Sequence, residues 1–594
     1  MLLSSYILII VFGLYSIGPY VIIGAGLLML VWGFLRLRKR NRKRLSALWH
    51  PSLLTFVFLC GCVIVCIGNG QFSSHDAYSF WARAVREMYV KSTFYINAES
   101  NIAHSDYNPM FASLQYSVVR VFGWSNAGLL YITAMPVIIV ATMISDRVAW
   151  KNWYRALLTA LALLLVYVSL DTTLTVTSVL IDGPLAMIFM GGVIVLSDTH
   201  DGDTVLPTVL ACAVLPGVKI YVGFLFAIAL AIILLIYRMQ KKQRTLTVVM
   251  AVVMMLFMQL SWSGIYNYDI ACKNQNESIA RAEYLGSESQ KSTSIPFRLK
   301  YLFEGNYRNK KISASLGNVT IGQCCAPAIK QVKSIMTSKV ATSRVKFWQM
   351  YASLFILLII TAFLLKREER QRYAKMLFVV VITNVIYTAG IMVTLAVQPQ
   401  TISSFSRYLS VSYLCVFVCA LYWLCRMERA TSQLVVLFVI VILLLGFTPQ
   451  YYSVALDCKP YPSATLAEAT YTDRVMQYSQ GKRTLVIDNR DYHGAYVSTS
   501  GLAYAYMYVA LPDYLNAIVL RYQNKNDYAM ITKDYLTKQI VSMRINRIVL
   551  LVEDQKLANA VSIILGANVS VAGPAVFDVQ IADGQPVYLP LTES

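Results

Sequence analysis

Four charged side chains stand beside apolar stretches of this chain, where they could act together on a phosphate-linked substrate. Asp76 and Asp182 are carboxylates, and Lys219 and Arg407 are cations. A carboxylate at the boundary of water and lipid can take the proton of an attacking hydroxyl, because partial burial makes it a stronger base. Lysine and arginine bind phosphate oxygens, and arginine can do so with two parallel donors. Two carboxylates and two cations in such positions predict a site for a lipid-phosphate substrate.

Long apolar stretches must position these residues, since 57% of the 594 residues are hydrophobic. A helix needs about 20 apolar residues to cross a bilayer, and in lipid each backbone polar group must bond within its own segment. The stretch before residue 36 could be one kinked helix or two pieces divided at Gly18-Pro19. We expect a mostly α fold of about 12–13 spans, with one or two before residue 36 and the others at 53–70, 126–145, 156–170, 184–197, 204–218, 222–237, 246–264, 347–365, 376–396, 408–425 and 434–448.

Much of the net charge of +21 lies in short loops between the apolar stretches, as in the block Arg36–Arg44. Cytoplasmic loops carry an excess of lysine and arginine, so this block predicts an inner position. The segment that begins near residue 71, after the next span, is then outside. A nucleic-acid-binding protein would interleave its basic residues with aromatics on a soluble face. The charge therefore excludes nucleic acid as an expected partner.

The chain is expected to have two domains. Residues 1–448 form a transmembrane domain with extracytoplasmic loops at about 71–125 and 265–345, and residues 449–594 form an extracytoplasmic α/β domain. Four cysteines lie in these outer regions and could form one or two disulfides. They are Cys272, Cys324, Cys325 and Cys458.

The C-terminal domain has the sequence pattern of a soluble α/β module. Segments 484–488 and 547–552 are continuous apolar runs typical of buried strands. Segments 533–543 and 555–565 are predicted helices, the second ending at Gly566. The module contains no nucleophile elbow, phosphate-binding loop or dinucleotide fingerprint. We expect it to bind or to support rather than to catalyse.

Asp76 is the second residue of the segment His75–Tyr89, whose pattern predicts an amphipathic helix at the outer membrane surface. A lipid-linked substrate could be met there. The plainer interpretation makes Asp76 a helix N-cap, because aspartate is favoured at that position. Asp182 could also be a cap, with Pro184 in the first turn. Both alternatives remain open.

The two cations have plain interpretations as well. Lys219 ends one apolar stretch and begins the next, so its ammonium could extend toward water or could contact phosphate. Arg407 stands at a predicted outer boundary, where the positive-inside trend disfavours arginine. We favour a phosphate contact for Arg407.

A second polar cluster, His104-Ser-Asp106-Tyr-Asn-Pro109, lies later in the first outer loop. Such a sequence is commonly a turn followed by a helix start, and we expect this helix on the membrane surface too. Alternatively, His104 and Asp106 could join His75 and Asp76 as ligands of a metal ion, although their spacing is not diagnostic.

The ordered set of motifs resembles that of GT-C type integral membrane glycosyltransferases. The resemblance is to bacterial polyprenyl-phosphate-sugar enzymes related to protein O-mannosyltransferases and to the aminoarabinose transferase of lipid A. In those families an acidic residue precedes an aromatic, alanine- and arginine-rich helix in the first outer loop. Asp76 has that position here. Later family elements resemble Asp182-Gly-Pro-Leu-Ala186, the helix-end Lys219 and Arg407-Tyr-Leu409.

The likeness in order and membrane side extends along residues 70–410, with three departures. Ala77 stands where many relatives have glutamate, Asn108 interrupts a Tyr-Pro element, and the glycine that often follows the lysine is displaced to Gly223. The second acidic position and any metal are therefore open.

The resemblance implies catalysis by Asp76 with Asp182 assisting, donor-phosphate binding by Lys219 and Arg407, and an inverting single displacement. The implied partners are a polyprenyl-phosphate-linked sugar, which is a membrane lipid, and a glycan, lipid or protein acceptor at the cell surface. A divalent cation is the one cofactor left open. The substrate-binding residues that the resemblance suggests are Tyr78, Trp81, Arg86, His104, Asp106 and Tyr107.

Two other functions remain as alternatives. A polysaccharide polymerase or ligase that uses a polyprenyl-diphosphate oligosaccharide would share the cationic outer face. A transporter of lipid-linked sugars would place charge near the bilayer midplane and show two similar halves, and the sequence shows neither pattern. In each case the protein is expected to be a multi-pass protein of the bacterial plasma membrane, with its active site on the extracytoplasmic face.

Overall fold

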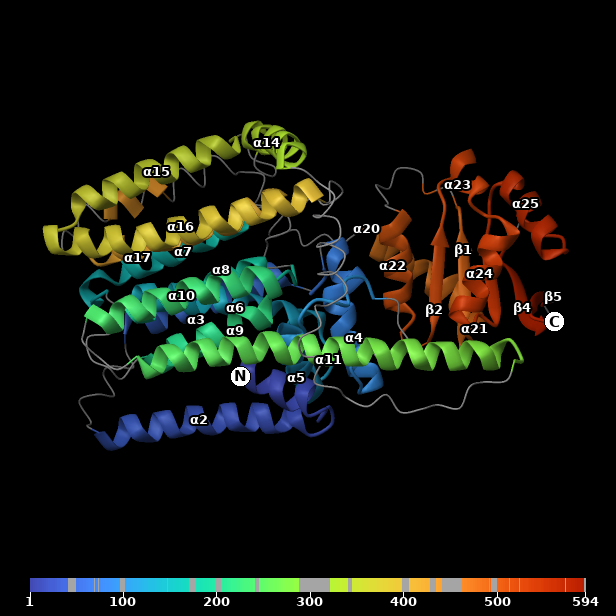
Figure 1. Ribbon diagram of the computed structural model, residues 1–594, viewed down its shortest axis with the longest axis horizontal. Coiled ribbons are helices and arrows are strands. Elements are labelled where there is room, and N and C mark those ends of the chain that lie inside the picture. Colours follow the sequence, from blue (N-terminus) through green and yellow to red (C-terminus); the bar gives the residue numbers. More distant parts are fainter. Residues whose placement is uncertain are drawn as a thin grey trace. The chain divides into compact units, whose positions relative to one another are not determined.

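In the computed structural model the chain is mostly helical, and its contacts divide it into two compact units (Figure 1). Unit 1 comprises Met1–Phe72, Asp106–Tyr266 and Leu299–Cys458, and unit 2 comprises Ser73–Ser105, Asn267–Arg298 and Lys459–Ser594. The structure describes residues 1–40, 50–68, 70–72, 74–96, 102–146, 148–169, 178–198, 205–240, 245–287, 321–339, 345–397, 405–427, 434–437, 439–440, 462–490, 492, 499–511, 513–522, 524–571 and 573–591.

Unit 1 is a bundle of helices. Within the described residues six helices are long and apolar enough to cross a membrane, so the chain is a polytopic membrane protein. The elements of the bundle are α1 (Leu2–Ser5), η1 (Tyr6–Val11), α2 (Gly18–Arg40), α3 (Pro51–Ile67), α5 (Met110–Phe122), α6 (Asn126–Ser145), η4 (Trp150–Asn152), α7 (Trp153–Ser169), α8 (Asp182–Asp198), α9 (Val205–Val218), α10 (Ile220–Gln240), the first part of α11 (Leu246–Tyr284), α14 (Ile321–Thr337), α15 (Phe347–Leu364), α16 (Arg367–Val397) and α17 (Phe405–Cys425).

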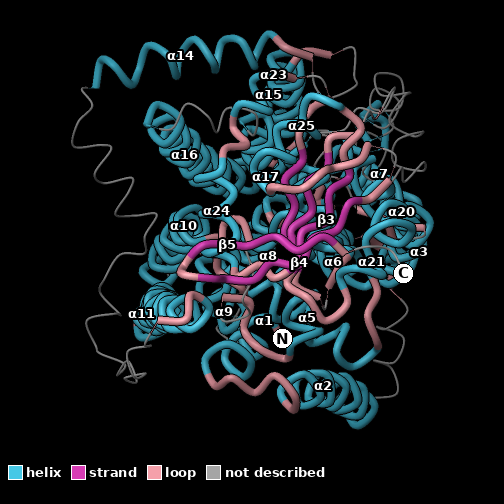
Figure 2. The backbone as a smooth tube through the Cα atoms, turned by 90° about the vertical axis from the view of Figure 1, so that its right-hand side faces the viewer, coloured by secondary structure: helices cyan, strands magenta, loops and turns pink. Residues whose placement is uncertain are grey.

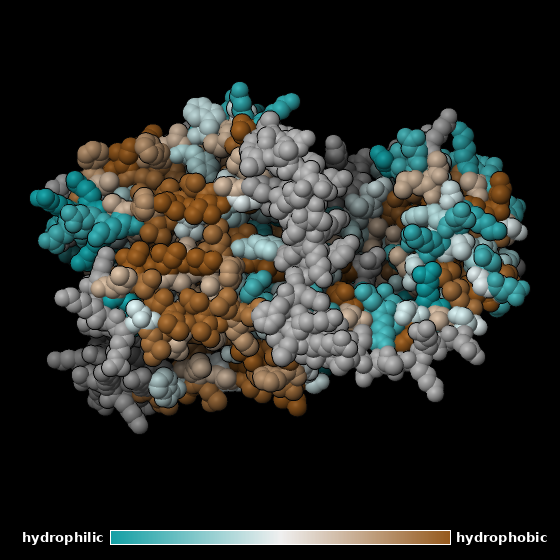
Figure 3. All heavy atoms as spheres, in the orientation of Figure 1, coloured by the Kyte–Doolittle hydropathy of each residue, from teal (hydrophilic) through white to brown (hydrophobic). Residues whose placement is uncertain are grey.

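The exposed surface of this bundle is largely apolar, as lipid requires. Figure 3 shows apolar side chains spread over the helices of unit 1, with polar side chains gathered at one end. Phe355 and Phe363 of α15 and Phe378 of α16 are each more than 60% exposed. Large exposed hydrophobic side chains on neighbouring helices are typical of a lipid-facing surface.

Each span predicted between residues 53 and 425 coincides with a described helix. α16 begins at Arg367 rather than near residue 376, and α11 differs more in length. It was predicted to end near residue 264, and it continues to Tyr284. An i,i+4 ion pair between Lys273 and Glu277, with 3.6 Å between Nζ and Oε1, supports the polar extension. Hydropathy marks where lipid ends rather than where the helix ends. Most of the predicted span 434–448 lies outside the described residues.

The N-terminal stretch is divided into two helical pieces, which decides the alternative that the sequence left open. η1 ends at Val11 and α2 begins at Gly18, with Gly13 at φ +65° in the link. Pro19 lies in the first turn of α2, where its missing N–H costs nothing.

The helix that follows Pro109 is packed inside the bundle, so the apolar face that was predicted to lie on the membrane meets protein instead. In α5, Phe111 and Tyr116 are buried. Ser113 Oγ donates to Ser5 Oγ at 3.2 Å, and Gln115 Nε2 donates to Thr133 Oγ1 at 3.0 Å. These polar contacts satisfy the other face of the helix, so both of its faces are covered by protein.

Unit 2 contains a five-stranded sheet with helices (Figure 2). The strand order is β2-β1-β3-β4-β5; β1 pairs in parallel with β2 and β3, and β4 and β5 are antiparallel. Its elements are η3 (Ala77–Trp81), α4 (Ala82–Lys91), the end of α11, α20 (Pro462–Thr470), η7 (Tyr471–Val475), α21 (Met476–Ser479), β1 (Thr484–Asp488), α22 (Thr499–Val509), β2 (Leu515–Val519), α23 (Lys525–Ala529), α24 (Lys533–Met543), β3 (Arg547–Leu551), α25 (Gln555–Leu565), β4 (Ala575–Ala582) and β5 (Gln585–Pro590).

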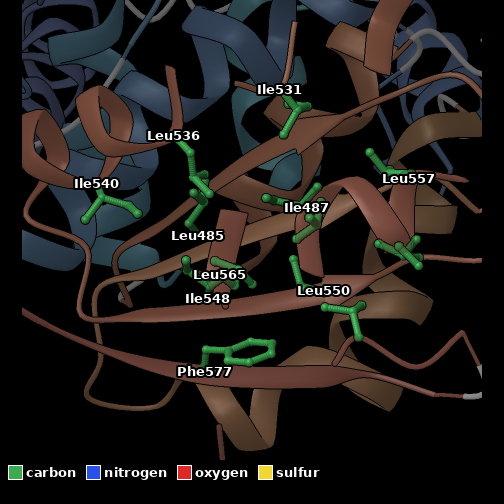
Figure 4. Packing of buried hydrophobic residues seen from close by; sticks show 14 of the residues in the cluster. Leu485, Ile487, Ile531, Leu536, Ile540, Ile548, Leu550, Leu557, Leu565 and Phe577 are labelled. Atoms are coloured by element: carbon green, nitrogen blue, oxygen red, sulfur yellow. The ribbon is translucent and has the colours of Figure 1, made fainter. Parts of the chain in front are cut away.

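The predicted elements of the C-terminal module are confirmed. β1, β3, α24 and α25 lie where the apolar runs and caps place them, and Gly566 ends α25 at φ +65°, a conformation that favours glycine. One core joins the strands to the helices (Figure 4): Leu485 and Ile548 from the sheet pack with Leu536 and Leu557 from the helices.

Candidate functional site

Lys219 and Arg407 meet at the carboxylate of Asp182 in unit 1. Lys219 Nζ donates to Asp182 Oδ1 at 2.5 Å, and Arg407 Nε lies 3.3 Å from Asp182 Oδ2. Asp182 is 2% exposed. A buried charge is tolerated only when it is paired, so these contacts stabilise the charged form of the cluster. The structure thus brings together three of the four charged residues that the sequence predicted.

Breaks and ends of helices position the three charges. Asp182 begins α8, and Arg407 lies in the first turn of α17. Lys219 lies between the end of α9 at Val218 and the start of α10 at Ile220. At the ends of helices, these charged residues do not interrupt the apolar middle of any helix or its backbone hydrogen bonds.

Gly223 permits the tight turn that presents Lys219. Its N–H donates to the carbonyl of Lys219 at 2.7 Å, and a Cβ at this position would lie 1.8 Å from the carbonyl oxygen of Leu215. No side chain fits there without moving backbone. The displaced glycine of the family pattern therefore has a structural role at this turn.

Aromatic side chains surround the charged cluster. The Tyr408 ring lies 4.7 Å from Lys219 Nζ and 5.4 Å from the Arg407 guanidinium carbon, so both cations contact its face. Tyr107 lies within electrostatic range of Lys219, as Tyr387 does of Asp182. Tyr107, a predicted substrate-binding residue, belongs to unit 1 together with the cluster.

Sequence reasoning missed the other tyrosines of the site. Tyr167 lies near Asp182, and a Cβ on Gly183 would meet its hydroxyl at 2.3 Å. Tyr387 is fully buried in α16. Both lie within predicted spans, where tyrosine gives no signal of its own. Tyr408 stood inside the quoted Arg-Tyr-Leu element and could have been named.

Asp76 belongs to unit 2, and its side chain is 42% exposed. It already has helical backbone angles, and it makes no capping hydrogen bond to η3. The N-cap interpretation is therefore wrong. His75 Nδ1 lies 3.6 Å from Asp76 Oδ1. An accessible carboxylate beside an imidazole can exchange a proton with a bound hydroxyl.

The helix after Asp76 is covered by protein on both faces, whereas the amphipathic pattern predicted one face toward the membrane surface. In η3 and α4, Tyr78, Trp81 and Arg83 are buried, and Glu87 is fully buried. The polar face is occupied by an ion pair between Arg83 Nε and Glu87 Oε1 at 3.3 Å. Arg86 lies over the ring of Tyr508, 4.5 Å from its centroid.

His104 and Asp106 form part of a turn before α5, as the plainer interpretation predicted. His104 has φ +54°, and the neighbouring Ala103 N–H donates to the carbonyl of Ser79 at 3.2 Å. Trp262 Nε1 donates to the carbonyl of Asp106 at 3.3 Å. The two residues fall on either side of the division between the units.

The described residues hold no group of three or more His, Cys, Asp or Glu side chains placed to bind a metal ion. The candidate ligands His75, Asp76, His104 and Asp106 are among these described residues. Cys272 is a free thiol. The side chains of Cys324, Cys325 and Cys458 lie outside the described residues.

No family model and no curated protein matches the chain. Among solved structures, two crystal structures of ArnT from Cupriavidus metallidurans are similar at 13% identity and a TM-score of 0.36. The apo structure matches over 92% of this chain and 98% of its own, and the one bound to undecaprenyl phosphate over 91% and 98%.

Proposed function

We propose that this protein is a glycosyltransferase that moves a hexosyl or pentosyl residue from a polyprenyl-phosphate donor to a glycan, lipid or protein acceptor on the extracytoplasmic face. One observation carries the proposal. Lys219 and Arg407, from separate parts of a membrane-spanning bundle, share the buried carboxylate of Asp182. Two cations held in place at the ends of spans fit the phosphate of a lipid whose chain remains in the bilayer.

The reaction is an inverting displacement at the anomeric carbon. The acceptor hydroxyl attacks that carbon, and the bond from the carbon to the phosphate oxygen breaks. The proton of the hydroxyl passes to Asp76, and the electron pair of the broken bond remains on the phosphate. Negative charge on the phosphate grows as the bond breaks, so fixed cations stabilise the transition state more than the ground state.

In this proposal Asp182 orients the cations. Each of its oxygens faces a cation, which leaves it poorly placed to take a proton from the acceptor. Without it, Lys219 and Arg407 would repel each other and turn away. Preorganised cations cost little rearrangement when the donor binds. The base is then Asp76, whose carboxylate is partly exposed.

The charge of the cluster favours a monophosphate donor over a diphosphate donor. Lys219, Arg407 and Asp182 together carry one more positive than negative charge. A sugar phosphodiester has a single negative charge, which this surplus balances. A diphosphate adds at least one further negative charge close to Asp182, and like charges at short range repel. The polymerase or ligase alternative needs such a donor.

The test supplies the purified protein with labelled polyprenyl-phosphate sugar and polyprenyl-diphosphate oligosaccharide in separate reactions, each with a cell-envelope acceptor extract. We expect consumption of the monophosphate donor alone, with loss of transfer in Asp76→Asn protein that retains the wild-type thermal stability. Consumption of the diphosphate donor alone would establish the polymerase or ligase alternative. Movement of either lipid across vesicles without transfer would indicate a transporter.

A further inference from the structure

We propose that α22 of the C-terminal module positions the helix that carries Asp76, and that Tyr508 is its principal positioning residue. The inference rests on the proposed function and adds a role for the module, which the sequence assigned only to binding or support. All the residues involved belong to unit 2.

Tyr508 contacts η3 and α4 at two points. The Tyr78 ring meets it edge to face, with 5.2 Å between centroids and 87° between planes. The Arg86 guanidinium carbon lies 4.5 Å from the centroid of the same ring. Tyr78 and Arg86 are two helical turns apart, so one buried ring contacts both and fixes how the helix is rotated about its axis.

A second contact fixes the polar face of the same helix. Arg83 Nη1 lies 3.5 Å from the sulfur of Met507, which precedes Tyr508 in α22. The Arg83 guanidinium also pairs with Glu87, whose other oxygen lies 3.6 Å from Lys91 Nζ. Arg83 and Glu87 are buried, so turning the helix would separate charges that have lost their water.

The third contact leads to Asp76 itself. The Tyr504 ring lies one turn before Tyr508 on the same face of α22 and meets the His75 ring edge to face, with 5.3 Å between centroids. Nδ1 of the same imidazole lies 3.6 Å from Asp76 Oδ1. α22 therefore restrains the residue that contacts the proposed base as well as the helix behind it.

A general base must stay within hydrogen-bonding reach of the acceptor hydroxyl, and a displacement of about 1 Å can cost roughly 100-fold in rate. Loss of the Tyr508 ring should therefore lower kcat and leave the KM for the donor nearly unchanged, because the donor phosphate is bound by other residues. Phenylalanine at this position keeps the ring and should retain most of the rate.

The experiment compares Tyr508→Leu with Tyr508→Phe and with Tyr522→Leu, a control on another segment of unit 2. Two readouts are taken on the full-length purified protein: amide hydrogen exchange over residues 77–91, and kcat and KM for transfer from the monophosphate donor. For Tyr508→Leu we expect exchange over 77–91 to rise at least tenfold and kcat to fall at least tenfold, with KM within about twofold. Tyr508→Phe and Tyr522→Leu should resemble the wild type in both readouts.

Unchanged exchange over 77–91 in Tyr508→Leu would overturn the positioning role. The role would also be overturned if exchange became faster in Tyr508→Leu while its kcat stayed equal to that of Tyr522→Leu. Should Tyr508→Leu fail to fold, Arg86→Met removes the contact from the other side and must raise exchange over the same residues. A wild-type protein that transfers no sugar would refute the proposed function, and the exchange data would then still show whether α22 restrains the helix.

Discussion

Lys219 and Asp182 are 37 residues apart in the chain, and they meet through a hydrogen bond of 2.5 Å between Nζ and Oδ1. Arg407 approaches the other carboxylate oxygen from a third helix. This arrangement turns three charges that are costly in a membrane into one preorganised cluster.

Replacement of Asp182 should destabilise the bundle. Asp182→Asn leaves two adjacent cations without their shared counter-charge, and breaking a buried ion pair costs about 3–5 kcal/mol. We expect a lower thermal midpoint of the detergent-solubilised protein together with loss of transfer. Glu277→Gln is the matched control, because the Lys273–Glu277 pair is half-exposed on the glutamate side and should contribute at most about 0.5 kcal/mol. Equal midpoints for the two variants would contradict the role given to Asp182.

Substitution of Arg407 by lysine should weaken donor binding. Lysine keeps the charge and loses the planar pair of donors that arginine offers to phosphate. We expect affinity for the polyprenyl-phosphate donor to fall about tenfold, equivalent to about 1.4 kcal/mol, with little change in thermal stability. Arg372→Lys, on an exposed part of α16, is the control and should bind the donor as the wild type does. Unaltered affinity in Arg407→Lys would contradict bidentate binding of the donor phosphate by Arg407.

Gly223→Ala should disturb the turn that presents Lys219. The added Cβ would collide with the carbonyl of Leu215, and overpacking of this kind typically costs about 1–3 kcal/mol. We expect a lower midpoint and weaker donor binding. Gly61→Ala in α3 is the control, since its Cβ would meet no atom within 4 Å. If both variants are equally stable and bind donor equally, the turn does not depend on glycine.

Alkaline pH should destabilise unit 2 in part through Tyr508. Burial raises the pKa of Tyr508 from 10.0 to about 12, although Arg86 opposes the shift. The contribution of the neutral Tyr508 side chain to the free energy of unfolding is complete below pH 10 and is lost as the pH rises toward 12. The loss is at most about 1.4 kcal/mol per pH unit. Tyr508→Phe cannot ionise, so its unfolding free energy should fall less steeply between pH 10 and 12. Identical slopes in denaturant titrations would contradict this assignment.

The positions of the spans could be predicted because lipid leaves an apolar stretch no structure other than a helix. The same physics indicated Lys219 and Arg407, since a charge beside a span is costly unless it is used. Their meeting at Asp182 was an inference from shared placement at helix ends, and the structure confirms that meeting.

What the sequence could not predict are contacts set by packing between distant segments. The amphipathic pattern of 82–91 indicates two chemically different faces. It does not show that the polar face is buried, where Arg83 and Glu87 pair with each other instead of with water. Tyr387 and Tyr508 look like ordinary helix residues until their neighbours are known. The length of α11 could not be predicted from hydropathy either, because the apolar stretch ends before the helix does.

The most direct test of the central claim is equilibrium binding of a polyprenyl phosphate to the purified wild-type protein, to Lys219→Met, and to Lys375→Met as an exposed control. We predict that Lys219→Met loses at least tenfold in affinity while Lys375→Met binds as the wild type does. Wild-type affinity in a folded Lys219→Met protein would contradict the assignment of this cluster to the donor phosphate.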